Sequence, residues 1–239
     1  MGILVKIIEN FVSKATITYK KQIAPHVFHI QIGGKALQEE HPLGYTVRIL
    51  VGKDKDLRLD DNIRSYSTWR VNKESGRVDI AICTHGNGSG SQWAKDCNVG
   101  DKIAFMWQKT NLVLDQSADG YVFIGDLSAL GHLYSINNGL PASRKVRSLI
   151  YGPNREDFFA DIDGKSPFTF HELRENAPEQ IIKAIPSLMD GLPENSLIYV
   201  AGDSRLCVQL NAYLKNEMRL NTRRLKIKPF WNPLKKGLE

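Results

Sequence analysis

The chain has 239 residues, enough for two domains of ordinary size, and its 42% hydrophobic and 24% charged residues exclude a disordered or collagen-like protein. Lys and Arg number 32 against 26 Asp and Glu, which gives a net charge of +6. That surplus favours an acidic partner, whether nucleic acid, an anionic membrane or an anionic small molecule, without choosing among them.

The first half of the chain has the residue alternation of β-strands. Polar residues alternate with β-branched or aromatic ones in short segments that end at Gly or at polar turns. The predicted strands are residues 14–20, 26–32, 45–51, 63–71, 77–84 and 102–108. Six short strands with regular turns predict a small antiparallel β-barrel.

After about Thr110 the pattern changes to apolar runs that end in Gly and alternate with helix-like stretches. The runs are residues 121–125, 146–151 and 197–202, and a helix is predicted from Ser204 to about Leu220. This order is typical of a parallel sheet with βαβ crossovers. We therefore predict a barrel domain over residues 1–113 and an α/β domain over residues 114–239 with a basic C-terminal tail.

Cysteine usage and hydropathy favour a cytoplasmic protein. The three cysteines, Cys83, Cys97 and Cys207, form no CxxC pair, which argues against a disulfide framework or a structural zinc site. The N-terminus lacks the pattern of a signal peptide, and no stretch reaches the roughly 20 apolar residues of a spanning helix. We expect a monomer that binds neither membranes nor nucleic acid.

The segment from Arg64 to Arg70 (RSYSTWR) is the most informative. Side chains alternate on a strand, so Arg64, Tyr66, Thr68 and Arg70 are predicted to share one face. A guanidinium, an aromatic ring and hydroxyl groups together could hold a flat cofactor that carries phosphate. An exposed strand face with solvated arginines is the alternative.

A Gly-rich turn follows one hairpin later. His85 to Ala94 (HGNGSGSQWA) leads into a helix predicted to begin near Ser91. The backbone N–H groups at such a helix start favour an anion, typically phosphate. The segment matches neither a Walker loop nor the dinucleotide fingerprint, and a simple loop with a serine cap is the alternative.

Taken together, these segments resemble the siderophore-interacting protein family, FAD-dependent ferric-siderophore reductases of the ferredoxin-reductase-like superfamily. The resemblance runs from about Lys14 to Gly237. It rests on the order of an Arg-x-Tyr-Ser stretch, a His-Gly…Ser-x-Trp-Ala stretch, Gly125-Asp126, Ala201-Gly202-Asp203 and Phe230-Trp231. The sequence departs from the family after Asp126, where Leu127-Ser128 replaces the usual Glu-Thr.

The resemblance implies a role for each matching residue. Arg64 would pair with FAD phosphate, Tyr66 would pack on the isoalloxazine, and Ser67 would lie near flavin N5. The implied FAD-binding residues are Arg64, Tyr66, Ser67, Thr68, His85, Gly86, Gly90, Ser91, Trp93 and Trp231. Those implied for NAD(P)H are Asp126, Gly202 and Asp203.

The implied reaction is the reduction of Fe(III) in a ferric siderophore. A flavin accepts hydride and can return electrons singly, so no catalytic side chain is required. Fe(II) is held less tightly than Fe(III) by hard oxygen donors, so reduction releases the iron. NADH or NADPH is the expected electron donor, and reduced ferredoxin is the alternative.

A cationic surface would receive the anionic chelate. The candidates are Arg48, Lys226, Lys228, Lys235 and Lys236, although each lysine could simply be solvated. Residues 1–113 carry a net charge of +5, residues 114–214 a net −5 and residues 215–239 a net +6. An anionic chelate steered to one basic region fits this uneven distribution.

A second hypothesis concerns binding rather than electron transfer. The barrel could be a non-enzymatic basic module of the oligonucleotide-binding type, although its aromatic residues form no evident stacking stripe. The six histidines show no metal-ligand spacing, so no protein-bound metal is expected.

Overall fold

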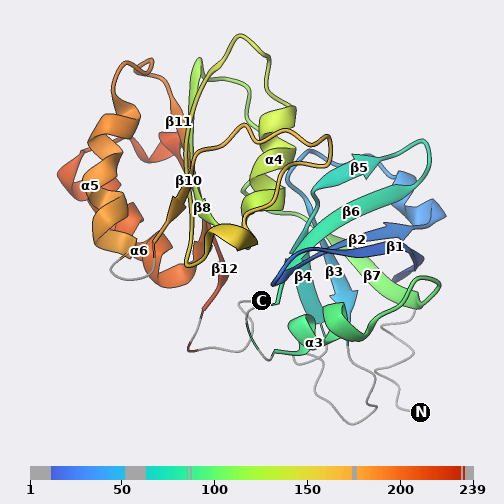
Figure 1. Cartoon of the computed structure of the whole chain (residues 1–239). Coiled ribbons are helices and arrows are strands. Elements are labelled where there is room, and N and C mark those ends of the chain that lie inside the picture. Colours follow the sequence, from blue (N-terminus) through green and yellow to red (C-terminus); the bar gives the residue numbers. More distant parts are fainter. Residues whose placement is uncertain are drawn as a thin grey trace, which may run out of the picture. The chain divides into compact units, whose positions relative to one another are not determined.

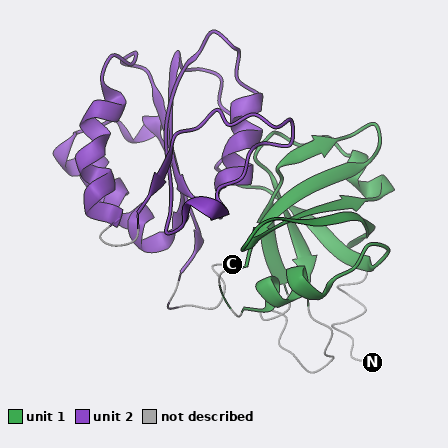
Figure 2. Ribbon diagram, in the orientation of Figure 1, with its two compact units in different colours: residues 1–110, 239 green, residues 111–238 purple. Residues whose placement is uncertain are grey.

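The computed structural model describes residues 12–51, 63–84, 86, 88–173, 177–232 and 234. The chain forms two compact units, residues 1–110 and residues 111–238 (Figure 2). Within the described ranges, no helix is both long and apolar enough to cross a membrane.

The first unit is a seven-stranded antiparallel sheet with one helix. Its strands are β1 (Ser13–Ala24), β2 (Val27–Gly33), β3 (Thr46–Leu50), β4 (Ile63–Ser67), β5 (Arg70–Asn72), β6 (Arg77–Cys83) and β7 (Lys102–Gln108), and its helix is α3 (Ser89–Asp96). The strand order is β4-β3-β7-β1-β2-β6-β5. The predicted antiparallel architecture is confirmed, with seven strands in place of the predicted six.

The additional strand arises because the predicted strand over residues 63–71 is two strands. β4 and β5 form the two ends of the strand order, yet only Thr68 and Trp69 separate them in the chain. In a flat sheet six strand spacings would hold these ends about 29 Å apart, whereas the step from Ser67 to Arg70 reaches at most about 11 Å. The sheet must therefore curl into a barrel.

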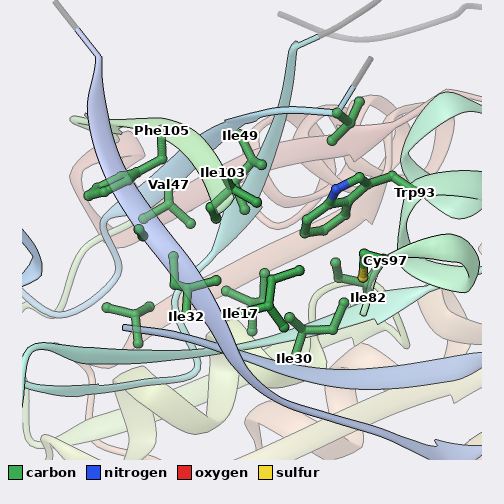
Figure 3. Close-up of a cluster of buried hydrophobic side chains, with 14 of the residues drawn as sticks. Ile17, Ile30, Ile32, Val47, Ile49, Ile82, Trp93, Cys97, Ile103 and Phe105 are labelled. Carbon is green, nitrogen blue, oxygen red and sulfur yellow. The ribbon is translucent and has the colours of Figure 1, made fainter. Parts of the chain in front are cut away.

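Apolar side chains of alternate strand residues fill the barrel (Figure 3). Ile17, Ile30, Ile32 and Phe105 are buried inside it. Trp93 of α3 joins the same cluster, so the helix is anchored to the barrel core.

The second unit is a five-stranded parallel sheet with helices on both faces. It contains β8 (Gly120–Asp126), α4 (Leu130–Asn138), β9 (Lys145–Gly152), β10 (Phe170–Glu172), α5 (Ala177–Met189), β11 (Leu197–Asp203), α6 (Ser204–Ala212) and β12 (Leu225–Trp231). The order is β10-β9-β8-β11-β12. Helix α4 covers one face and helices α5 and α6 cover the other (Figure 1), as the predicted βαβ pattern requires.

Hydrogen bonds from the second sheet and from α4 hold the segment that precedes β8. The Tyr199 hydroxyl donates to the Val113 carbonyl and accepts from the Asp115 amide, both at 3.0 Å. His132 of α4 bonds the Leu112 carbonyl through Nε2 at 2.8 Å. A carbonyl only accepts, so Nε2 carries the proton and Nδ1, which is buried without a partner in the described structure, is unprotonated.

Burial lowers the pKa of His132 from 6.5 to about 4. Between these two pH values the unfolded chain binds a proton that the folded chain rejects, so stability falls as the pH is lowered through this range. In this range we expect the free energy of unfolding of the native protein to fall by up to about 1.4 kcal/mol per pH unit. This fall comes in addition to the one that the His132→Gln variant shows over the same range. Denaturant unfolding of both proteins from pH 7 to 4.5 measures this difference.

A histidine NMR titration checks the same point without a variant. The His132 ring should stay neutral down to about pH 5. An imidazolium signal for His132 at pH 6 would contradict the prediction.

Candidate functional site

Arg64 and Tyr66 lie next to the start of α3. In the pairing of β3 with β4, Arg64 lies opposite Ile49 and Tyr66 opposite Val47, both of which are buried. A Cβ atom added to Gly90 would lie 2.7 Å from the Tyr66 hydroxyl and 3.3 Å from Cγ of Arg64. A larger residue at this position would require the Tyr66 side chain or the helix to shift.

Trp93 supports the Tyr66 ring from one side. The two rings are stacked, with centroids 5.7 Å apart and an interplanar angle of 25°. Trp93 is buried in the barrel core, whereas Tyr66 is half-buried. The orientation of the tyrosine ring is therefore set by core packing.

The amino end of α3 suits an anion. The first four amides of a helix lack intrahelical partners, and no described side chain caps this helix at Gly88. Ser91 lies in the first turn, and the Arg64 side chain lies beside Gly90. A helix start, a guanidinium and an oriented aromatic ring match the diphosphate and the flat ring of a flavin dinucleotide.

Thr68, also predicted in the barrel, makes a different contact. Thr68 is outside β4 and buried, with its hydroxyl donating to the Tyr45 carbonyl, so the prediction that Arg64, Tyr66, Thr68 and Arg70 share one strand face is wrong. The cause is the break between β4 and β5.

Ser67 ends β4 opposite Thr46, and its side chain alternates with that of Tyr66. Gly86 is exposed, and within the described part of the chain no atom lies within 4 Å of a Cβ built on it. His85 lies outside the described residues.

A second group lies where the strand order of the parallel sheet reverses, between β8 and β11. Asp126 ends β8 and is buried. It accepts hydrogen bonds from the Ser128 amide and hydroxyl, from the Asp203 amide and from the Trp231 indole. The last two bonds are 2.8 Å long. Ligands of open α/β sheets bind outside the carboxyl ends of strands at such a point.

Burial raises the pKa of the Asp126 carboxyl above its ordinary value, and the hydrogen bonds from Ser128 and Trp231 oppose that rise. All four donors present N–H or O–H groups, which favours the ionised form. Asp126 thus joins the ends of β8, β11 and β12 around one carboxylate.

Gly202 makes this arrangement possible. Its φ is +127°, and an added Cβ would lie 2.4 Å from Oδ2 of Asp126. The strand register shifts between Gly202 and Asp203, so that Asp203 pairs with Trp231. Asp203 caps α6 by accepting from the Arg205 amide, and its carboxylate pairs with the Arg205 guanidinium at 2.6 Å.

The structure gathers the residues predicted for the cofactors in this unit around Asp126. Asp203 and Trp231 bond to it, and Gly202 leaves room for it. Trp231, which the family resemblance assigns to the flavin, is therefore bound to a residue assigned to the nucleotide.

The predicted cationic residues have different surroundings. Lys226 of β12 pairs with Asp115 at 3.0 Å. Lys228 lies with its ammonium 5.8 Å from the Phe230 ring centroid and lines a groove of about 700 Å³ between α6 and β12. Arg48 of β3 lies opposite Ser65, whose side chain alternates with those of Arg64 and Tyr66. Lys235 and Lys236 lie outside the described residues.

The sequence reading missed Ser128 and Arg205. Each lies two residues after an aspartate and bonds back to it, a local pattern that the Asp-x-Ser and Asp-x-Arg spacing could have indicated. Among the described residues, no cluster of three or more metal-ligating side chains occurs.

Two family models match the chain. Residues 53–108 match the siderophore-interacting FAD-binding domain, and residues 118–233 match the siderophore-interacting protein model. The ferric vibriobactin reductase ViuB of Vibrio cholerae is 24% identical over 174 residues. That match spans 70% of this chain and 64% of ViuB, less than two thirds of the relative's length.

Solved structures share the two-domain fold. The siderophore-interacting protein SipS of Aeromonas hydrophila matches with a TM-score of 0.78 at 20% identity, over 94% of this chain and 92% of SipS. The ferredoxin-NADP+ reductase of Plasmodium falciparum matches with a TM-score of 0.71 at 15% identity, over 93% and 97%. Both units of the chain are thus similar to siderophore-interacting proteins, the first over residues 53–108 and the second over residues 118–233.

Proposed function

We propose that this protein is an FAD-dependent reductase of Fe(III) in an anionic organic chelate, a ferric siderophore. The observation that carries the proposal is the contact of Arg64 and Tyr66 with Gly90 at the amino end of α3. This contact combines a cation, an aromatic ring and a helix start, which are the groups that FAD requires. The match of residues 53–108 to an FAD-binding domain supports the same cofactor.

In this proposal the barrel residues bind and orient the flavin. Arg64 and the first turn of α3 neutralise the diphosphate, and Tyr66, supported by Trp93, packs on the isoalloxazine. The bound flavin supplies hydride acceptance and single-electron transfer. The side chains contribute position and charge, so no general acid or base is required of the protein.

The carboxyl edge of the parallel sheet is the proposed site of a nicotinamide nucleotide. Asp126, Gly202 and Asp203 lie at the reversal of strand order, where nucleotides bind in open α/β sheets. NADH or NADPH is the proposed donor, and reduced ferredoxin remains the alternative. The cytoplasm is the proposed location, in keeping with the absence of a disulfide among the three cysteines.

Lys228 is the proposed contact for the chelate in the described part of the second unit. It lines the groove between α6 and β12, and Lys226 of the same strand is not among the residues that line this groove. A ferric siderophore is a substrate here, and a cation favours its anionic oxygen donors.

Gly90→Ala should weaken FAD binding, because the added methyl group would lie 2.7 Å from the Tyr66 hydroxyl and displace the ring or the helix. We expect the Kd for FAD to rise about tenfold or more, as for a displacement worth about 1.4 kcal/mol. Fluorescence titration of the flavin-free protein measures it.

Gly88→Ala is the matched control. Gly88 is the N-cap of α3, but no atom of the described residues lies within 4 Å of a Cβ built on it, and its φ of −69° suits any residue. Equal FAD affinities for the two variants would refute the packing argument. A native protein that is colourless and takes up no FAD would refute the proposed function itself.

Lys228→Ala should raise the KM for an anionic ferric catecholate siderophore about threefold to tenfold, through loss of a charge contact of about 1 kcal/mol. Lys226→Ala should raise it less, because Lys226 is not among the residues that line the groove between α6 and β12. Steady-state iron reduction measures both KM values.

Stopped-flow bleaching of the flavin by NADH, NADPH and reduced ferredoxin identifies the electron donor. The bleaching rate should be unchanged in Lys228→Ala. An unaltered KM in that variant would remove Lys228 from the substrate site.

A further inference from the structure

Lys20 binds the carboxyl end of the helix whose amino end forms the proposed phosphate site. Its Nζ atom donates to the carbonyl oxygens of Lys95 at 2.6 Å and of Cys97 at 2.7 Å. Lys20 belongs to β1, so these bonds join α3 to a strand 75 residues earlier in the chain. The ammonium also lies 5.1 Å from the Phe28 ring centroid, which restricts the side chain further.

These bonds matter because α3 has only eight residues. The last four carbonyls of a helix have no intrahelical partner, and they carry the negative end of its dipole. In so short a helix they make up half of the carbonyls. An ammonium that satisfies two groups at this end fixes the helix terminus and offsets its negative charge.

Core packing holds α3 along its length, and Lys20 adds charged hydrogen bonds at its carboxyl end. Trp93 and Ala94 are buried in the barrel core, as is Cys97 just after the helix, and Gly90 lies against Tyr66. The core contacts are apolar, so they leave the negative end of the helix dipole to the ammonium of Lys20. Loss of the Lys20 bonds would loosen this end, and a tilt of the helix would move the first-turn amides relative to Arg64 and Tyr66.

We propose that Lys20 is a positioning residue for the flavin dinucleotide. By holding the carboxyl end of α3 it aims the amino end at the diphosphate, without touching the cofactor itself. This inference rests on the proposed FAD site. It predicts an effect confined to flavins that carry the diphosphate, because a riboflavin ring would use Tyr66 and not the helix start.

The test compares FAD with riboflavin, each titrated into the flavin-free full chain. Lys20→Met keeps the length of the side chain over Phe28 and removes the charge. We expect its Kd for FAD to rise about fivefold, the effect of one favourable charge at a helix end, with the Kd for riboflavin unchanged. Lys20→Arg, which restores a cationic donor, should recover most of the FAD affinity.

Lys21→Met is the matched control. Lys21 is the next residue of β1, so its side chain points to the opposite face of the strand, where it is exposed. The Lys21→Met variant should bind FAD and riboflavin with the affinities of the native protein. An equal loss of both flavins in Lys20→Met, or unchanged FAD affinity, would overturn the proposal. Failure of the native protein to bind FAD would instead overturn the proposed function.

Discussion

The second unit depends on one buried carboxylate. Asp126 lies at the carboxyl end of the central strand β8 and receives hydrogen bonds from Ser128, Asp203 and Trp231. A buried carboxylate without such partners would be strongly destabilising, so Asp126 requires these donors. The same requirement fixes glycine at position 202, where any side chain would occupy the space of the carboxylate. The geometry of the proposed nucleotide site therefore follows from satisfying one acceptor.

The barrel solves the corresponding problem by packing rather than by charge. Trp93 belongs to the hydrophobic core and also orients Tyr66, so core stability and the proposed flavin site share one side chain. Rigid secondary structure of this kind holds a binding group more precisely than a loop does. Polar contacts are placed around this frame, with Arg64 at one end of α3 and Lys20 at the other.

Sequence patterns predicted what depends on local order. Alternation predicted the strands of the barrel, and apolar runs ending in Gly predicted β8, β9 and β11 of the parallel sheet. The break at Thr68 and Trp69 was not predictable, because alternation continues through it and only barrel closure forces the chain to cross there. The bond of Trp231 to Asp126 depends on a register shift at Gly202, and the Lys20 bonds join residues 75 positions apart. Neither leaves a local pattern.

Barrel closure also bears on solubility during folding. Because β4 and β5 are joined by two residues, the ends of the first sheet lie close together and offer little open edge to another chain. The parallel sheet ends instead at β10 and β12. The first is only three residues long, and the second carries Lys226, Lys228 and Pro229. Short length, repeated positive charge and a residue without an N–H group all discourage strand addition, so these features protect the protein against edge-to-edge aggregation.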